Sequence, residues 1–312
     1  MHFDSEAHPV SVSVCICTYQ RLEPLSRLLE RLEGVAKVAP DKIKVSVCVA
    51  DDDPAFSARE ICSVDRKTTI TSVSYLPVGS QNISTARNAS LAVGLVKSDF
   101  VAFIDDDCLP DVSWLVELVA TASLTQADIV SGYCIDIPDA RAPGWLKSEG
   151  FLTSTDDLVD GQPITIGALK NTLVRADWLR KNPVVRFDPA LGKIGGEDVQ
   201  FFASAQRCNA VHRFSRSAIV QEVLPLNRST MKYQLRRAFW YGNSEAVTSI
   251  MSKSFGRFRL LASGGKLIAT SVGQTVAALA HRRPVRSRFR LSQILRGVGK
   301  ILGTCGIKVS HN

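Results

Sequence analysis

Apolar runs rich in β-branched residues alternate with amphipathic stretches over roughly the first 130 residues of the chain. The pattern predicts strands at 10–17, 43–50, 69–76 and 100–104. It predicts helices at 22–35, where leucines recur at helical spacing, and at 55–64, 82–96 and 114–123. Such alternation with short links is typical of a parallel sheet covered by helices on both faces. We therefore expect an α/β fold with a doubly wound, mostly parallel sheet.

The pattern changes after Asp128. Strands are predicted at 128–137 and 163–174, on either side of a loop rich in Pro, Gly and Asp. A basic and aromatic helix is expected at 227–239, and a mostly apolar run follows at 260–280.

Polar residues follow three of the predicted strands. They are Thr18 and Tyr19 after the first strand, Asp51–Asp53 after the second, and Asp105–Asp107 after the fourth. Parallel sheets bind ligands at the carboxyl ends of their strands, so we expect these side chains to converge on one site.

The wholly apolar strand at 100–104 leads directly into the carboxylates of Asp105, Asp106 and Asp107. Adjacent like charges raise each other's pKa values and are costly beside a buried strand unless a cation compensates them. Oxygen ligands at this density suit Mg²⁺ or Mn²⁺ bridging to phosphate. The alternative is a solvated acidic turn, with Pro110 ending the strand.

The usual glycine-rich nucleotide motifs are missing from the sequence. No G-x-x-x-x-G-K-[ST] occurs, and no G-x-G-x-x-G follows the first strand, so P-loop and dinucleotide-binding proteins are poor interpretations. A phosphate group would instead be held by metal and arginine. Arg87 is the leading candidate, and the alternative is an ordinary surface arginine on a helix.

Two glycines precede a pair of carboxylates at the start of a further helix. Gly195 and Gly196 let the backbone approach a ligand closely. The helix dipole favours the ionised form of Glu197 and Asp198, and an ionised carboxylate there could act as a general base. The alternative is a simple acidic first turn.

These segments together resemble the glycosyltransferases of family 2, which have the GT-A fold. The resemblance rests on Cys17-Thr18-Tyr19-x-Arg21, the acidic strand end at Asp51, the segment 82–88, Asp105-Asp106-Asp107 and Gly196-Glu197-Asp198. It is closest to the bacterial exopolysaccharide glucosyltransferases of the succinoglycan type, and it covers roughly residues 10–245.

The resemblance implies roles for these residues. Asp105 and Asp107 would form the D-x-D pair that holds Mn²⁺ or Mg²⁺, and Asp198 would be the general base, supported by Glu197. The nucleotide-sugar donor would be bound by Thr18, Tyr19, Arg21, Asp51, Asp52, Arg87, Asp105 and Asp106. The reaction implied is inverting, metal-dependent transfer of a sugar, with glucose from UDP-glucose as the expected donor, in exopolysaccharide biosynthesis.

One position departs from the family pattern. Many relatives carry a His in a Val-His-Glu context, where this chain has Val220-Gln221-Glu222. Gln is a poorer metal ligand than imidazole, so Gln221 is expected to weaken metal binding or to change its geometry. His212 lies nearby in sequence but out of register, and is expected to be structural. A nucleotidyltransferase and a catalytically inactive scaffold or lectin remain as alternative functions.

The charge of the chain is unevenly distributed. Of the net charge of +8, residues 246–312 carry +12 with no Asp or Glu, which leaves −4 for residues 1–245. We therefore expect a GT-A domain at 1–245 and a basic, apolar segment at 246–312 with a different partner. The eight cysteines lie mostly in apolar runs, and the polar start of the chain does not resemble a signal peptide, so a cytoplasmic protein with reduced thiols is expected.

The basic segment is expected to meet a membrane. The apolar run at 260–280 is interrupted by Lys266, Gln274 and glycines, and is marginal for a spanning helix. An arginine cluster follows it, at Arg282, Arg283, Arg286, Arg288 and Arg290. Arginines interleaved with apolar residues favour a peripheral or monotopic contact with anionic lipid on the cytoplasmic face of the inner membrane. No nucleic-acid-binding motif accompanies them, and a lipid-linked acceptor on undecaprenyl diphosphate would suit this location.

Overall fold

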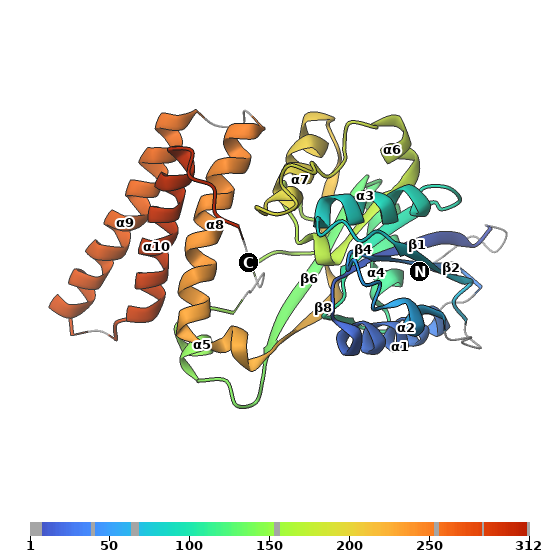
Figure 1. Ribbon diagram of the computed structural model, residues 1–312, viewed down its shortest axis with the longest axis horizontal. Helices are drawn as coiled ribbons and strands as arrows, with labels where there is room; N and C mark the ends of the chain where they lie inside the picture. The colour runs from blue at the N-terminus through green and yellow to red at the C-terminus, as the bar shows by residue number, and fades with distance from the viewer. Residues whose placement is uncertain are drawn as a thin grey trace. The chain divides into compact units, whose positions relative to one another are not determined.

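The computed structural model describes residues 8–38, 41–63, 69–152, 157–252, 256–282 and 284–310 (Figure 1). Its strands are β1 (Val10–Thr18), β2 (Ile43–Asp51), β3 (Ser72–Pro77), β4 (Phe100–Asp105), β5 (Cys108–Pro110), β6 (Ile129–Pro138), β7 (Thr172–Arg175) and β8 (His212–Leu224). Its α-helices are α1 (Leu22–Val38), α2 (Arg59–Ser63), α3 (Ile83–Gly94), α4 (Trp114–Thr125), α5 (Trp145–Ser148), α6 (Ala176–Lys181), α7 (Glu197–Arg207), α8 (Met231–Met251), α9 (Arg257–Ala280) and α10 (Ser287–Thr304). Two short 3₁₀ helices are η1 (Leu169–Asn171) and η2 (Leu226–Ser229).

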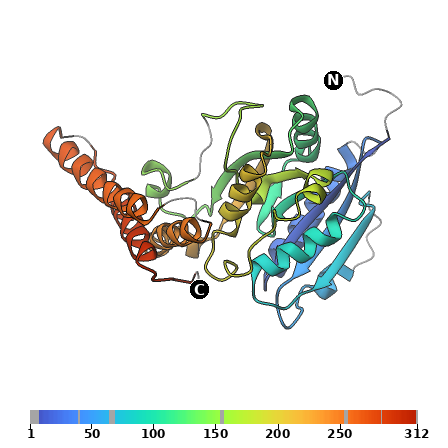
Figure 2. The ribbon, with the colours of Figure 1, turned by 90° about the horizontal axis from the view of Figure 1, so that it is seen from above.

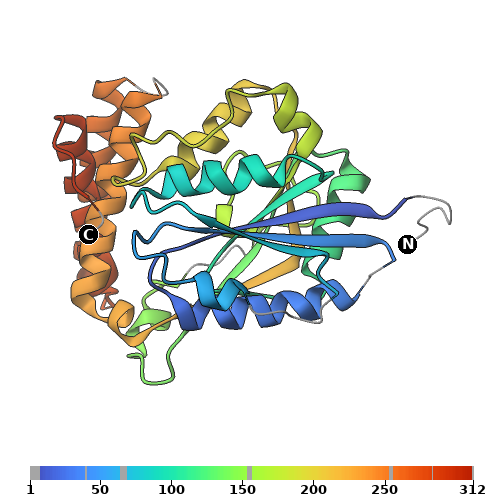
Figure 3. The ribbon, with the colours of Figure 1, turned by 45° about the vertical axis from the view of Figure 1, so that its right-hand side comes forward.

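The first four strands form the parallel part of one sheet. The order of the sheet is β3-β2-β1-β4-β7-β6-β8-β5, and β1 pairs in parallel with both β2 and β4. Helices α1 and α3 cover opposite faces of these strands (Figure 3). Both faces of β1 are buried, because Val12, Val14 and Ile16 point to one face and the likewise buried Ser13 and Cys15 point to the other. The predicted doubly wound α/β sheet is confirmed.

Three pairings in the other half of the sheet, β4–β7, β6–β7 and β5–β8, are antiparallel, and two predictions were wrong here. Strand β7 pairs antiparallel with β4 and β6, but it begins only at Thr172 of the predicted 163–174 and ends one residue later, at Arg175. The chain resumes as β5 after the acidic turn, with Pro110 at its end, and β5 pairs with β8. Strand β8 was not predicted, because polar and apolar residues along it do not alternate regularly enough to give the period of two that marks a strand.

Two helices also differ from their predicted lengths. The helix expected at 55–64 is reduced to α2, since 54–58 form turns around Asp53, and residue 64 lies outside the described residues. The helix expected at 227–239 begins only at Met231, where Thr230 caps it by accepting a hydrogen bond from Tyr233 N, and it continues to Met251.

The chain divides into two compact units whose boundaries differ from those expected. The first comprises Met1–Ile135, Thr155–Pro189 and Ser204–Glu222, and the second Asp136–Ser154, Ala190–Ala203 and Val223–Asn312. The boundary expected at 245/246 falls inside α8, which is one continuous helix. A charge boundary in sequence thus does not coincide with a packing boundary.

Helices α8, α9 and α10 of the second unit pack through glycines. Helix α10 lies between α8 and α9 (Figures 1 and 2). A Cβ atom at Gly299 would lie 2.0 Å from the carbonyl oxygen of Phe239, and one at Gly242 would lie 1.9 Å from that of Arg296. These glycines therefore allow the backbones of α8 and α10 to touch. No helix within the described segments has the length and apolarity needed to cross a bilayer.

Replacing Gly299 by Ala tests this packing. The added methyl group has no room, so we expect the free energy of unfolding to fall by about 1–3 kcal/mol. Gly265→Ala on α9 is the matched control, because nothing lies within 4 Å of its added Cβ. That control is expected to gain about 0.5–1 kcal/mol from the better helix propensity of Ala. Urea unfolding followed by circular dichroism measures both, and a stabilising Gly299→Ala would contradict the tight packing.

Candidate active site

The polar strand ends predicted from sequence do converge within the first unit. In the parallel register Thr18 of β1 lies beside Asp51 of β2, and Cys17 lies beside Asp105 of β4. The carboxyl ends of β1, β2 and β4 therefore form one edge, as the topology requires (Figure 3).

Two arginines and a threonine hold the three carboxylates that follow β4. Asp106 is buried, and it accepts hydrogen bonds from Thr18 Oγ1 at 2.8 Å and from Arg21 Nη1 at 2.9 Å. The same Arg21 nitrogen lies 2.8 Å from Asp107 Oδ2, and Arg87 Nη2 lies 3.2 Å from Asp105 Oδ1. Burial raises the pKa of Asp106 to about 6, against the opposing effect of Arg21. The solvated-turn alternative is wrong for Asp106.

Arg87 is not an ordinary surface arginine. Its side chain is mostly buried, with its guanidinium 5.7 Å from the centroid of the Phe187 ring. The neighbouring Asn88 exchanges two hydrogen bonds with the backbone of Phe187, at 2.7 and 3.0 Å, and Asn82 Nδ2 donates to Pro189 O at 2.9 Å. Asn82 and Asn88 thus attach the segment 187–189 to helix α3. The sequence pattern did not predict this contact, and the two asparagines on either side of Arg87 were the only residues that could have indicated it.

Asp51 and Asp52 hold the loops around the strand ends. Asp51 is fully buried and accepts hydrogen bonds from Ala58 N at 2.9 Å and from Tyr75 Oη at 2.8 Å, and burial with this contact raises the pKa of Tyr75 to about 12. Asp52 accepts from Ser80 N and Oγ at 2.9 and 2.6 Å. Tyr19 is more exposed, with its hydroxyl 3.4 Å from Gln81 Nε2.

The position that departs from the family pattern lies close to the acidic turn. In the β5–β8 register Gln221 pairs with Leu109, and Glu222 pairs with Cys108. Glu222 accepts a hydrogen bond from Lys170 Nζ, and both side chains are largely buried. Burial alone lowers the pKa of Lys170, but the Glu222 carboxylate outweighs it and raises the pKa. Nothing in the sequence pattern singled out Lys170, because its partner is 52 positions away.

Glu197 and Asp198 belong to the second unit, where α8 supports their loop. Gly195 and Gly196 have φ angles of +89° and +90°, which other residues rarely adopt. Trp240 Nε1 donates to Ile194 O at 2.8 Å, and a Cβ at Gly196 would lie 2.3 Å from Thr248 Oγ1. Glu197 is buried, whereas Asp198 is half-buried and accepts from Val199 N at 2.7 Å.

The carboxylates of Asp105 and Asp107 fit a divalent cation that arrives with a diphosphate. No group of three or more His, Cys, Asp or Glu side chains in the described residues is arranged to hold a metal by itself. Mg²⁺ usually takes only one or two protein carboxylates and completes its shell with phosphate oxygens and water. Two carboxylates at the end of β4 match that requirement.

His212 is structural, as expected. It is buried in the first unit, and its Nε2 lies 2.9 Å from Ser131 Oγ. Burial lowers the pKa of His212 from 6.5 to about 4.

The fold and the strand-end site define a nucleotide-sugar glycosyltransferase of the GT-A type. The sequence profile described as "Glycosyl transferase family 2" matches residues 13–182, and this chain belongs to that family of enzymes. It is 31% identical over 302 residues to the succinoglycan biosynthesis protein ExoM of Rhizobium meliloti (strain 1021), covering 95% of this chain and 94% of that relative.

Two solved structures share the fold. Residues 1–349 of TarS from S. aureus superpose with a TM-score of 0.52 at 16% identity, covering 96% of this chain and 92% of TarS 1–349. GalNAc-T7, crystallised with UDP, GalNAc and Mn²⁺, superposes with a TM-score of 0.54 at 14% identity, covering 80% of this chain and 52% of that one.

The neutral state of His212 predicts a specific pH dependence of stability. The pKa is near 6.5 in the unfolded chain and about 4 in the fold, so protonation favours unfolding as the pH falls from 6.5 toward 4. Between pH 7 and pH 5 this one group is expected to remove about 2 kcal/mol. Urea unfolding at both pH values should show a smaller loss in His212→Gln than in the unchanged protein. An equal loss would mean that the fold does not lower the pKa of His212.

Proposed function

We propose that this chain transfers a sugar from a UDP-sugar, with UDP-glucose as the expected donor, to a lipid-linked saccharide in exopolysaccharide biosynthesis. The observation that carries the proposal is the acidic turn after β4, with Thr18, Arg21 and Arg87 bonded to it at the carboxyl ends of parallel strands. The similarity to ExoM supports the pathway, and the UDP and UDP-GlcNAc complexes of TarS support the donor class.

The donor would lie along this edge of the sheet. Tyr19 offers an exposed ring for the base, and Asp52, just after β2, would lie beside it. Asp51 is fully buried and bonded to Ala58 N and Tyr75 Oη, so it would support this pocket from behind rather than touch the base. Arg21 and Arg87 are the cations available to a diphosphate, and their forked guanidinium groups suit phosphate oxygens. Asp106 would keep Thr18 and Arg21 in place rather than contact the sugar.

Asp105 and Asp107 would hold Mn²⁺ or Mg²⁺. When bound there, the ion would supply positive charge that stabilises the departing diphosphate. Gln221 lies on β8 and pairs with Leu109 of β5, the strand that begins just after the acidic turn. The family pattern would place a His ligand at this position, so the affinity of the site for the ion is expected to be modest.

Asp198 is the proposed general base. Its carboxylate lies in the first turn of α7, and the acceptor hydroxyl would pass its proton to it. The hydroxyl oxygen then forms a bond to C1 of the sugar as the bond from C1 to the diphosphate oxygen breaks on the opposite side. This single displacement inverts the configuration at C1, and buried Glu197 would support the loop.

A peripheral contact with the cytoplasmic face of the inner membrane would bring this enzyme to a lipid-linked acceptor. Phe258, Val276 and Leu279 on α9 are 86%, 60% and 65% exposed, and with Leu261 and Val272 they recur at helical spacing. Helices α9 and α10 contain no acidic residue. Apolar side chains with a basic surround suit an anionic lipid surface. Of the arginine cluster, Arg288 instead pairs with Glu149 at 2.7 Å, and Arg283 lies outside the described residues.

The donor assignment is tested by UDP release from a panel of UDP-sugars with Mn²⁺, with Mg²⁺ and with EDTA. We expect slow hydrolysis of one donor that EDTA abolishes. Asp107→Asn should lower the rate by about 10–100-fold through weaker metal binding. Asp177→Asn is the matched control, because that carboxylate is exposed and its salt bridge, to Lys181 on its own helix, is an interaction of small effect.

The same experiment separates the other functions. UDP-sugar binding without turnover, with metal and with a polyprenyl-linked acceptor, would favour a scaffold. Release of pyrophosphate from UTP and a sugar 1-phosphate would identify a nucleotidyltransferase. Lack of binding to every UDP-sugar would contradict the donor class. Asp198→Asn should lower transfer to an acceptor by about 10²–10⁴-fold and leave donor binding in place.

The membrane contact is tested by sedimentation with vesicles that contain phosphatidylglycerol. Replacing Val272, Val276 and Leu279 by Ser should weaken binding by about tenfold or more, because three apolar side chains lose their lipid contact. The matched control replaces Val96, Leu124 and Val184, which are more exposed still and belong to the first unit, and it should bind unchanged. Equal binding by both triple variants would place the contact elsewhere.

A further inference from the structure

The two glycines that lead into α7 lie against one face of α8. Trp240, Ser244 and Thr248 are spaced four residues apart along α8, so they share that face. A Cβ atom at Gly195 would lie 2.1 Å from Cζ2 of Trp240. A Cβ atom at Gly196 would lie 2.3 Å from Oγ1 of Thr248 and 3.3 Å from Oγ of Ser244. The close approach that the glycines permit is therefore made to side chains of α8.

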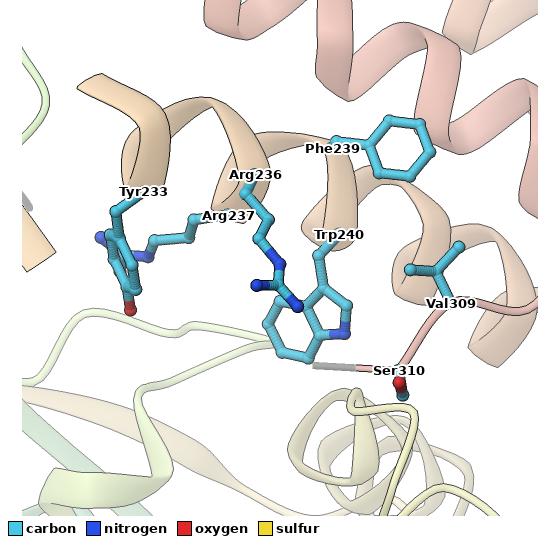
Figure 4. Close-up of a pocket in the computed structure, with 7 residues that line it drawn as sticks. All are labelled: Tyr233, Arg236, Arg237, Phe239, Trp240, Val309 and Ser310. Atoms are coloured by element: carbon cyan, nitrogen blue, oxygen red, sulfur yellow. The ribbon is translucent and has the colours of Figure 1, made fainter. Parts of the chain in front are cut away.

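Trp240 holds the loop 194–196 in two ways. Its Nε1 donates to Ile194 O at 2.8 Å, and the outer edge of its ring occupies the space beside Gly195. The ring points to a different side of α8 from that of Phe239 (Figure 4). It also borders a pocket of about 80 Å³, whose other lining residues are Tyr233, Arg236, Arg237, Phe239, Val309 and Ser310. One side chain of α8 thus holds the loop through both a hydrogen bond and van der Waals contact.

The loop needs this external support. Gly195 and Gly196 have φ angles of +89° and +90°, and glycine gives up more conformational freedom on ordering than any other residue. Turn hydrogen bonds from Ile194 N and Gly195 N to Leu191 O, at 2.9 and 2.7 Å, hold the beginning of the loop. Two successive glycines directly before a helix are flexible unless neighbouring side chains limit their conformations.

The position of the loop determines where α7 begins. Gly196 O accepts a hydrogen bond from Gln200 N at 3.0 Å, and this bond joins the loop to the helix. Asp198 is the second residue of α7 and lies only two positions after Gly196. A shift of the glycines against α8 would therefore move the carboxylate of Asp198 as well.

We propose that Trp240 is a positioning residue for sugar transfer and acts through Asp198. By bonding Ile194 O and occupying the space beside Gly195, it keeps the start of α7 where the carboxylate of Asp198 can accept a proton from the attacking hydroxyl. Thr248 contributes by volume, because its buried Oγ1 has no hydrogen-bond partner among the described residues. This inference rests on the proposed function, since it states how the proposed base is held.

The test is a double-mutant cycle on the full-length protein with Mn²⁺ and the UDP-sugar that it hydrolyses fastest, so that water takes the place of the acceptor. Trp240→Phe lacks Nε1 and the outer ring atoms, and it should lower kcat about tenfold while leaving KM for the donor unchanged. In the Asp198→Asn background the same substitution should lower kcat less than about twofold, because the base that Trp240 positions is gone. A tenfold loss in both backgrounds overturns the inference.

Tyr241→Phe is the matched control for the loss of a hydrogen bond from α8. The hydroxyl of Tyr241 accepts from Arg237 Nη2 at 3.1 Å and does not bond the loop, and the substitution keeps the ring beside Trp240. This variant should hydrolyse the donor at the unchanged rate. A loss equal to that of Trp240→Phe would show a general effect on α8 and would overturn the inference.

A second pair of variants applies if Trp240→Phe does not fold. Thr248→Ala opens space beside Gly196 and should lower kcat about threefold or more. Thr248→Val keeps the volume and loses only the hydroxyl without a partner, so it should restore the rate. Equal rates in the unchanged protein and both variants would contradict the support by α8.

The cycle also separates failure of this inference from failure of the proposed function. If Asp198→Asn hydrolyses the donor as fast as the unchanged protein, the proposed base is wrong, and the inference falls with it. If Asp198→Asn is slow and Trp240→Phe is not, only the inference is overturned.

Discussion

The structure of the first unit depends on how three adjacent carboxylates are accommodated where β4 ends. Asp106 is buried, and as an isolated charge it would destabilise the fold. The same cost of burying its charge raises its pKa to about 6. Thr18 and Arg21 come from the end of β1 and the turn after it, and Arg87 comes from α3. The cost of burying acidic groups thus fixes the relative positions of three elements.

The same contacts give the edge of the sheet its rigidity. The carboxylate oxygens of Asp51 and Asp52 accept hydrogen bonds from backbone amides and a hydroxyl of the following loops, and these bonds hold the loops in place. Helix α3 adds a second attachment through Asn82 and Asn88, which bind the segment 187–189. A preorganised edge of this kind would lose little conformational entropy if it binds the donor as proposed.

In the second unit, glycines make the contact between α8 and α10, and the larger side chains of these helices face elsewhere. Glycines place the backbone of α10 directly against α8, so few large side chains are needed between those helices. Helix α9 is consequently left with apolar residues on its outer face, and α8 with an aromatic and basic face toward the pocket. The tryptophan that lines this pocket also replaces the missing side chain of Gly195, so one residue serves both the loop and the pocket.

The amino-acid sequence determined the parallel half of the sheet, because β-branched runs and amphipathic leucine spacing are local signals that tertiary contacts did not override. It also determined which residues gather at the strand ends, since parallel topology alone brings Thr18, Asp51 and Asp105 to one edge. Only the tertiary structure decided the pairing of Arg21 and Arg87 with the acidic turn, the Lys170–Glu222 pair and strand β8. Each joins or pairs residues far apart in the chain, where spacing carries no information. The end of the first unit at Glu222 was likewise set by packing, which the change in charge at 246 did not reveal.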